Sequence, residues 1–118
     1  MPKAKYLVGY AEKMAFKNSF FDRILAVDSF HHWNNQFQAL LEIKRVLKSD
    51  GIFLLVEFDP TTRLGHFIRS GERALKMGSN FFTPNQIREM YRKVKLLVKK
   101  QFYIVPGTFV TISTKKKP

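Results

Sequence analysis

The chain has 118 residues, 45% of them hydrophobic, and its 21 Lys and Arg outweigh 9 Asp and Glu to give a formal net charge of +12. This length supports one modest hydrophobic core rather than several domains, and the hydrophobic fraction excludes an intrinsically disordered chain. The absence of cysteine excludes disulfides and thiolate metal sites.

The charge balance favours anionic partners such as RNA, DNA or acidic lipid headgroups. The alternative is that the lysines, which are spread along the whole chain, form only a solvated basic surface. No apolar run approaches the roughly 18 residues that span a bilayer, and Met1–Lys5 has no signal-peptide core. We therefore expect a soluble, cytoplasmic protein without a membrane partner.

The first part of the chain predicts two strands separated by a loop. Tyr6 to Val8 form a short strand candidate, and Gly9 opens a polar loop that runs to Phe16. Ile24 to Val27 then form a continuous apolar run that is typical of a buried strand.

A helix-period segment follows, and Ser49-Asp50-Gly51 is expected to stop it before a second apolar run from Ile52 to Phe58. Two short apolar runs joined by a helix indicate parallel strands with a right-handed crossover, because parallel neighbours need a long connection.

The second half predicts a helix and a hairpin. Residues 64–78 are basic and interrupted by glycine, which indicates a short helix or a mobile lid. Thr83 and Pro84 are suited to begin a helix that ends near Val94. Leu96 to Tyr103 and Phe109 to Ser113 flank a Pro106-Gly107 turn and predict an antiparallel hairpin.

One set of residues carries a family resemblance. Three successive stretches, F-D-R-I-L-A-V-D-S-F-H-H-W, E-I-K-R-V-L-K-S-D-G and I-F-L-L-V-E-F, resemble the fourth strand, fourth helix and fifth strand of class I S-adenosylmethionine-dependent methyltransferases, in particular the type 11 group. The matching positions are Phe21, Asp22, His32, Glu42, Arg45, Val46, Leu47, Lys48 and Gly51. Ser49 and Asp50 depart from the family's proline and glycine.

The resemblance implies an α/β fold, namely a truncated Rossmann-like methyltransferase sheet with a parallel β-α-β core and a C-terminal antiparallel hairpin. Residues 1–118 would form a single partial domain, with residues 64–82 as a lid or insert over the acceptor pocket. None of the glycines lies in a G-x-G-x-G arrangement. The resemblance therefore covers the C-terminal portion of the family's domain and leaves out its principal cofactor-binding motif.

The cofactor implied by the resemblance is S-adenosylmethionine, with binding weakened by the missing motif. The cofactor-binding residues would be Tyr10, Ala11 and Glu12 in the first loop, and Val27 and Asp28 at the end of the strand. Tyr10 replaces an aspartate that reads the adenine amino group in the family. Asp28 contacts the cofactor edge or, equally, caps the entry to the helix.

The candidate catalytic residues are His32 and Glu57. His32 matches a family position near the methyl acceptor; the alternative is a histidine that only orients its loop. Glu57, together with Asp59, is placed to act as a general base for a hydroxyl or amine; the alternative is loop capping or pairing with a lysine. No metal site is expected, because adjacent histidines such as His31 and His32 should point in different directions.

Phe30 and Trp33 are interpreted either as a platform for the acceptor or as core residues. The function expected overall is that of a methyltransferase-like protein, weak or inactive alone, that lacks the main cofactor-binding motif. The alternative is a basic, non-catalytic module that binds RNA or a protein partner on the same scaffold.

The family strand order is 3-2-1-4-5-7-6, so the run from Ile24 to Val27 would lose its neighbour and become an exposed sheet edge. We expect two chains to join at this edge as a homodimer. The alternatives are that Tyr6 to Val8 pair there, or that a separate polypeptide supplies the missing half.

Overall fold

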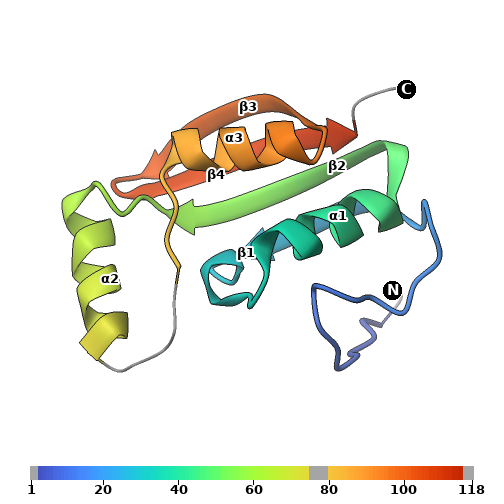
Figure 1. Ribbon diagram of the computed structural model, residues 1–118, viewed down its shortest axis with the longest axis horizontal. Helices are drawn as coiled ribbons and strands as arrows, with labels where there is room; N and C mark the ends of the chain where they lie inside the picture. The colour runs from blue at the N-terminus through green and yellow to red at the C-terminus, as the bar shows by residue number, and fades with distance from the viewer. Residues whose placement is uncertain (1–2, 75–79, 116–118) are drawn as a thin grey trace.

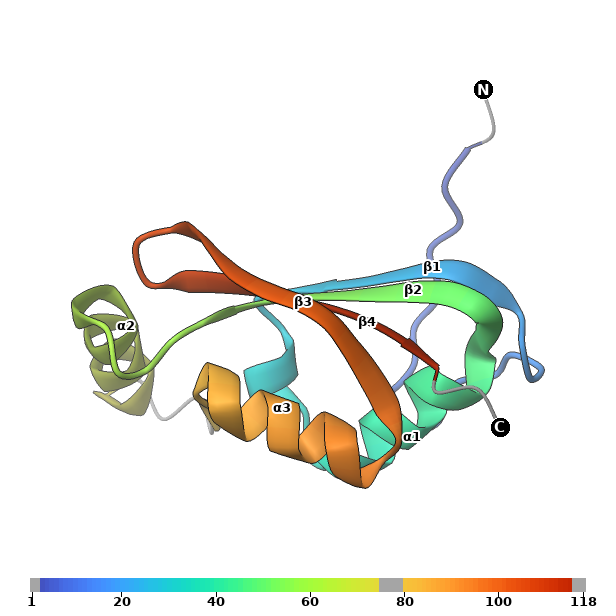
Figure 2. The same ribbon diagram turned by 90° about the horizontal axis from the view of Figure 1, so that it is seen from above.

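The computed structural model describes residues 3–74 and 80–115. In chain order its elements are β1 (Phe21–Val27), the 3-10 helix η1 (Phe30–His32), α1 (Gln36–Val46), β2 (Leu47–Phe58), α2 (Arg63–Ala74), α3 (Pro84–Lys93), β3 (Leu96–Val105) and β4 (Thr108–Lys115). The strands form one four-stranded sheet, and α1 and α3 cover the same face of it (Figures 1 and 2).

The predicted β-α-β core is confirmed. β1 and β2 are parallel, with Leu25 opposite Leu54 and Val27 opposite Val56, and α1 connects them. The sheet order is β1-β2-β4-β3, which corresponds to strands 4-5-7-6 of the order expected from the resemblance. The core lies under α1 and α3, where the fully buried side chains include Leu40, Phe53 and Tyr91.

The predicted end of the first helix is wrong by a few residues. α1 ends at Val46, and Leu47 already has extended backbone and begins β2. Ser49-Asp50-Gly51 lie within β2, at the point where its parallel register with β1 is interrupted. The buried Leu47 side chain explains the early exit, since an extended backbone directs it into the core.

The predicted strand from Tyr6 to Val8 is also wrong. These residues have no regular secondary structure, and all three side chains are exposed. They do not pair with the edge of β1 either, because β2 is the neighbour of β1 among the described strands. Three apolar residues without a neighbouring strand leave their backbone groups to water, so the run gains nothing from strand geometry.

The loop before β1 is held by one arginine and one glutamate of α1. The Arg45 guanidinium donates to the carbonyls of Met14 (2.9 Å) and Phe16 (2.7 Å), and its Nε lies 2.6 Å from Glu42 Oε1. Glu42 Oε2 also accepts the Met14 amide at 2.7 Å. The hydrogen bonds from Arg45 and from the Met14 amide lower the pKa of Glu42 to about 2.

The helix and the hairpin predicted for the second half are confirmed. Thr83 caps α3 through a reciprocal capping box with Gln86. β3 and β4 are antiparallel, and Gly107 has φ of 81° in the turn between them, a conformation that favours glycine.

The segment predicted as a short helix or lid forms α2, which lies beyond the end of the sheet where β2 terminates (Figure 1). Gly65 makes this position possible, since a Cβ there would lie 1.7 Å from the Asp59 carbonyl oxygen. Residues 75–79 of the predicted lid lie outside the described residues. Within the described part of the chain, no helix has the length and apolar character needed to cross a bilayer.

Replacing Glu42 with glutamine should destabilise the protein at neutral pH by about 1–2 kcal/mol, because hydrogen bonds to a carboxylate weaken when the charge is lost. The pKa of Glu42 is depressed in the fold, so its contribution is present above about pH 4.5 and is lost as the pH falls towards about 2. Urea unfolding of both proteins at pH 7 and near pH 2.5 measures the difference, which should shrink at the lower pH.

The matched control is Glu89→Gln. Glu89 pairs with Arg92 three residues later, as Glu42 pairs with Arg45, but on the solvent-exposed face of α3. This substitution should leave the urea midpoint nearly unchanged, because exposed pairs contribute little. Equal effects of the two substitutions at pH 7 would contradict the role assigned to Glu42.

Candidate functional site

The ends of β1 and β2 bring the candidate residues together. Because the two strands are parallel, Asp28 after β1 and Glu57 near the end of β2 lie at the same edge of the sheet. Asp28 has φ of 51°, a left-handed conformation that aspartate tolerates, and its amide still donates to the Val56 carbonyl at 3.0 Å. The chain then turns into η1, which carries His31 and His32.

The centre of this site is a buried pair between His31 and Glu57. Their side chains are 1% and 5% exposed, and His31 Nδ1 lies 2.6 Å from Glu57 Oε1. The sequence predicted two alternatives for Glu57, namely a general base, or a residue that caps a loop or pairs with a lysine. In the structure the side chain of Glu57 pairs with a histidine rather than with a lysine. The ring of His31 also stacks on Phe81, with centroids 4.4 Å apart.

The other nitrogen of His31 faces further carboxylates. Nε2 lies 3.4 Å from Glu72 Oε2 in α2 and 3.6 Å from Asp28 Oδ1. His32 Nε2 reaches the same Glu72, at 3.0 Å from Oε1. The reason given above for expecting no metal site is therefore wrong, because the two imidazole rings lie 4.0 Å apart and converge on one carboxylate.

The surrounding charges decide the protonation of His31. Burial lowers its pKa, but the hydrogen bond and charge of Glu57 and the charges of Glu72 and Asp28 outweigh burial and raise the pKa. Burial raises the pKa of Glu57 as well. We assign the proton of the pair to His31, because its ring is the group that faces several carboxylates.

Asp59 is part of the scaffold. Its Oδ1 accepts from the amide (2.9 Å) and the hydroxyl (2.7 Å) of Thr61, and Oδ2 accepts from the Tyr103 hydroxyl. Burial opposes ionisation, but these hydrogen bonds lower the pKa of Asp59. The loop-capping alternative is thus confirmed for Asp59.

Phe30 and Trp33 belong to the core rather than to an acceptor platform. Phe30 is fully buried, and its ring centroid lies 5.1 Å from that of Trp33 and 5.8 Å from that of Phe82. Trp33 is partly buried and packs against the same core.

The residues predicted to bind the cofactor lie in two places. Val27 and Asp28 end β1 beside the histidines, whereas Tyr10, Ala11 and Glu12 lie in the loop fastened to α1, where Gln38 Nε2 donates to the Glu12 carbonyl at 3.3 Å. Tyr10 is exposed, and it lines a hollow with its neighbours in residues 7–16.

Glu72 was not among the site residues predicted from the sequence. It lies in a segment interpreted only as a helix or lid, and its contact with the histidines spans a distance along the chain that local patterns do not encode. One signal was available: Glu72 is the only acidic residue between Asp59 and Glu89, in an otherwise basic run.

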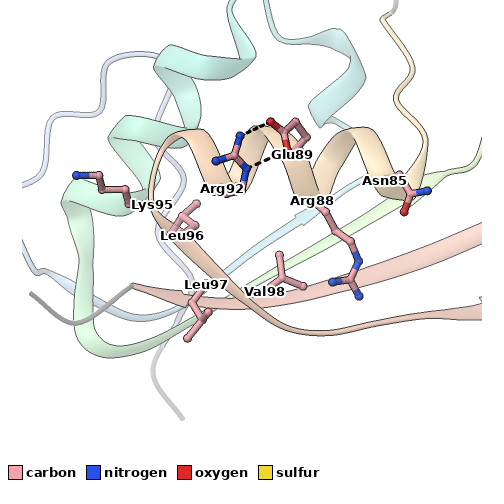
Figure 3. Close-up of a pocket in the computed structure, with 8 residues that line it drawn as sticks. All are labelled: Asn85, Arg88, Glu89, Arg92, Lys95, Leu96, Leu97 and Val98. Atoms are coloured by element: carbon pink, nitrogen blue, oxygen red, sulfur yellow. Dashed lines mark hydrogen bonds and ion pairs between the residues drawn. The ribbon is translucent and has the colours of Figure 1, made fainter.

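A second hollow lies between α3 and the start of β3 (Figure 3). It is lined by Asn85, Arg88, Glu89, Arg92, Lys95, Leu96, Leu97 and Val98. Arg92 pairs with Glu89, with 2.5 Å between Nη2 and Oε1, and Arg88 Nε donates to Gln101 at 2.7 Å. Two of its cationic side chains are therefore engaged within the protein.

Comparison with known proteins relates this fold to one family. Residues 1–55 match the family described as a methyltransferase domain. The chain is 36% identical over 58 residues to the ubiquinone/menaquinone biosynthesis C-methyltransferase UbiE of Coxiella burnetii, which covers 49% of this chain and 23% of that protein. The chain thus spans about a quarter of the length of this relative.

Solved structures share the fold. One is a chain in the complex between the Haloferax volcanii Trm112 methyltransferase activator and a methyltransferase, with a TM-score of 0.84, 18% identity, and coverage of 94% of this chain and 61% of that chain. Another is a S-adenosylmethionine-dependent methyltransferase from Thermotoga maritima, with a TM-score of 0.80, 24% identity, and coverage of 93% and 63%.

The match over the first 55 residues and the shared sheet confirm the resemblance to the S-adenosylmethionine-dependent methyltransferases, and the chain has their Rossmann-like α/β fold.

Proposed function

We propose that this chain forms the acceptor side of a S-adenosylmethionine-dependent methyltransferase site and that, alone, it binds the cofactor weakly and is of low or no activity. The observation that carries the proposal is the cluster of Asp28, His31, His32 and Glu57 at the carboxyl ends of two parallel strands. Open α/β sheets bind their ligands at this edge. The proposal places this chemistry in the cytoplasm.

The described residues fit one side of the cofactor. The exposed ring of Tyr10 and the backbone of Ala11 and Glu12 suit the adenine, and Val27 and Asp28 approach from the end of β1. The 118 residues contain no glycine-rich turn to hold the rest of the ligand. Weak binding follows, because only part of the ligand surface is enclosed.

The proposed roles of the candidate catalytic residues differ. His32 is 34% exposed and is placed to contact an acceptor, whereas Glu57 is buried behind His31 and acts by orienting that ring. When bound, the cofactor supplies an activated methyl group, so alignment and exclusion of water account for most of the catalysis. His32 and the buried pair would serve that alignment.

Cofactor binding is tested by NMR titration with S-adenosylhomocysteine, the demethylated product. We expect a dissociation constant in the millimolar range, which corresponds to about −4 kcal/mol. The resonances that move should be those of Tyr10 to Glu12 and of Val27 and Asp28. Val27→Lys should weaken the shifts, while Val105→Lys, an equally exposed valine of the hairpin, should not. Unmoved resonances at all five positions would refute the cofactor site.

We also propose a homodimer through the edge of β1 from Ile24 to Val27. β1 has a sheet partner on one side among the described strands, and Leu25 and Val27 are 64% and 53% exposed on the face away from α1 and α3. An edge segment without charged side chains, as from Ile24 to Val27, tends to pair with another strand. A protein partner is the other candidate, since one structure with this fold is a complex with an activator.

Light scattering after size exclusion should give twice the 13.8 kDa mass of the chain. Leu25→Lys should convert the protein to a monomer, because a charge on this edge disfavours strand pairing. Leu97→Lys, on the opposite edge strand β3, should leave the dimer intact. A monomeric mass for the unmodified chain at high concentration would rule the dimer out.

The second candidate function is a basic binding module. It is favoured by the hollow between α3 and β3, which Arg88, Arg92 and Lys95 line (Figure 3). The ion pair of Arg92 with Glu89 argues against a phosphate site in this hollow, because it neutralises one of the cationic side chains.

Single-stranded RNA binding at several salt concentrations separates the two functions. If the hollow binds phosphate, Lys95→Ala should lower the slope of the logarithm of RNA affinity against the logarithm of salt concentration by about one. Lys48→Ala is the control and should leave this slope unchanged, because Lys48 lies on β2 and pairs with Asp22 of β1. Salt-independent or undetectable binding would leave the methyltransferase-like site as the function.

A further inference from the structure

Three potential metal ligands converge where η1 meets α2. The side chains of His31, His32 and Glu72 each offer one ligand atom within 4.8 Å of the others. The Asp28 carboxylate lies beside this group, with Oδ1 at 3.6 Å from His31 Nε2, and belongs to a separate group with His31 and Glu57. The set contains two imidazole nitrogens and carboxylate oxygens, which are ligands that divalent transition-metal ions such as Zn²⁺ accept.

The distances between these atoms match the edges of a small coordination sphere. Ligands about 2.0–2.1 Å from a tetrahedral zinc ion are separated from one another by roughly 3.3 Å. His31 Nε2 lies 3.4 Å from Glu72 Oε2, and His32 Nε2 lies 3.0 Å from Glu72 Oε1. The side chains therefore need only small adjustments to surround an ion.

A second, independent observation is the state of His31. The side chain is 1% exposed, yet Nε2 has no hydrogen-bond partner, and it faces Glu72 and Asp28. Its other nitrogen, Nδ1, is held by Glu57 Oε1 at 2.6 Å. A carboxylate that holds one ring nitrogen, so that the other presents its lone pair, is the usual support for a metal-binding histidine.

We propose that His31 Nε2, His32 Nε2 and the Glu72 carboxylate bind a divalent transition-metal ion of the zinc type, with water completing its coordination. Glu57 is the positioning residue that fixes the His31 ring. Asp28 is 58% and His32 34% exposed, so the ion reaches the site from solvent.

The bound ion would tie α2 to the loop after β1. Glu72 is the ligand that comes from α2, and the two histidines come from the segment between β1 and α1. A proton on His31 Nε2 is the alternative way to compensate the facing carboxylates. An ion and a proton compete for the same lone pair, so the metal-free and metal-loaded chains must be compared directly.

The test is calorimetric titration of the EDTA-treated, dialysed full chain with zinc chloride. We expect one equivalent of Zn²⁺ to bind with a micromolar or lower dissociation constant. Glu72→Gln and His32→Asn should each weaken binding at least about tenfold, since each removes a ligand. His66→Asn is the matched control, because it removes an exposed histidine of α2 outside the cluster and should leave the affinity unchanged.

Trypsin cleavage after Arg69 and Arg73 gives a second readout. Zinc should slow this cleavage severalfold in the wild-type chain and in His66→Asn but not in Glu72→Gln, with circular dichroism confirming that each variant is folded. Absence of zinc binding would overturn the proposal in favour of a protonated His31. Equal zinc affinity in the wild type and in folded Glu72→Gln would overturn it as well.

Discussion

The parallel pairing of β1 with β2 is the constraint on which the site depends. With Val27 opposite Val56, the residues that follow each strand emerge at the same edge of the sheet, and the crossover through α1 returns the chain in the same direction. This places His31 against Glu57 although 26 positions separate them. An antiparallel pairing of the same strands would send Asp28 and Glu57 to opposite ends.

Negative charge is concentrated at this edge of the sheet, whereas the molecule as a whole is strongly positive. The chain carries a net charge of +12, yet three of its nine acidic residues, namely Asp28, Glu57 and Glu72, surround the two histidines. Carboxylates at such short distances, of which Glu57 and Glu72 are largely buried, need compensating positive charge. A bound cation or a proton on His31 supplies it, and this requirement makes the cluster, rather than the basic surface, the most informative feature of the protein.

The sequence predicted the parts of the fold whose signals are local. Continuous apolar runs located β1 and β2, and the Thr83-Pro84 pair located the start of α3, because burial and capping act within a few residues. The run from Tyr6 to Val8 had similar residues but no neighbouring strand, and neighbours cannot be read from a short run. Arg45 and Glu42 were found only through the resemblance, and the structure supplies their reason in the loop they hold.

The candidate site was predictable only in part. Asp28 and His32 follow the end of β1 and Glu57 lies near the end of β2, and the sequence does locate these strand ends. That His31 rather than His32 is the buried partner of Glu57 depends on how η1 turns, and the approach of Glu72 depends on how α2 packs against Asp59. Both are tertiary properties that no spacing rule encodes.

The most direct test of this account is a solution NMR measurement of the β1–β2 pairing together with the His31 ring. The account predicts parallel cross-strand contacts in the register Leu25 to Leu54 and Ala26 to Leu55, and a slowly exchanging proton between His31 Nδ1 and Glu57. Close contacts between the α-protons of the two strands, the signature of antiparallel pairing, would contradict it.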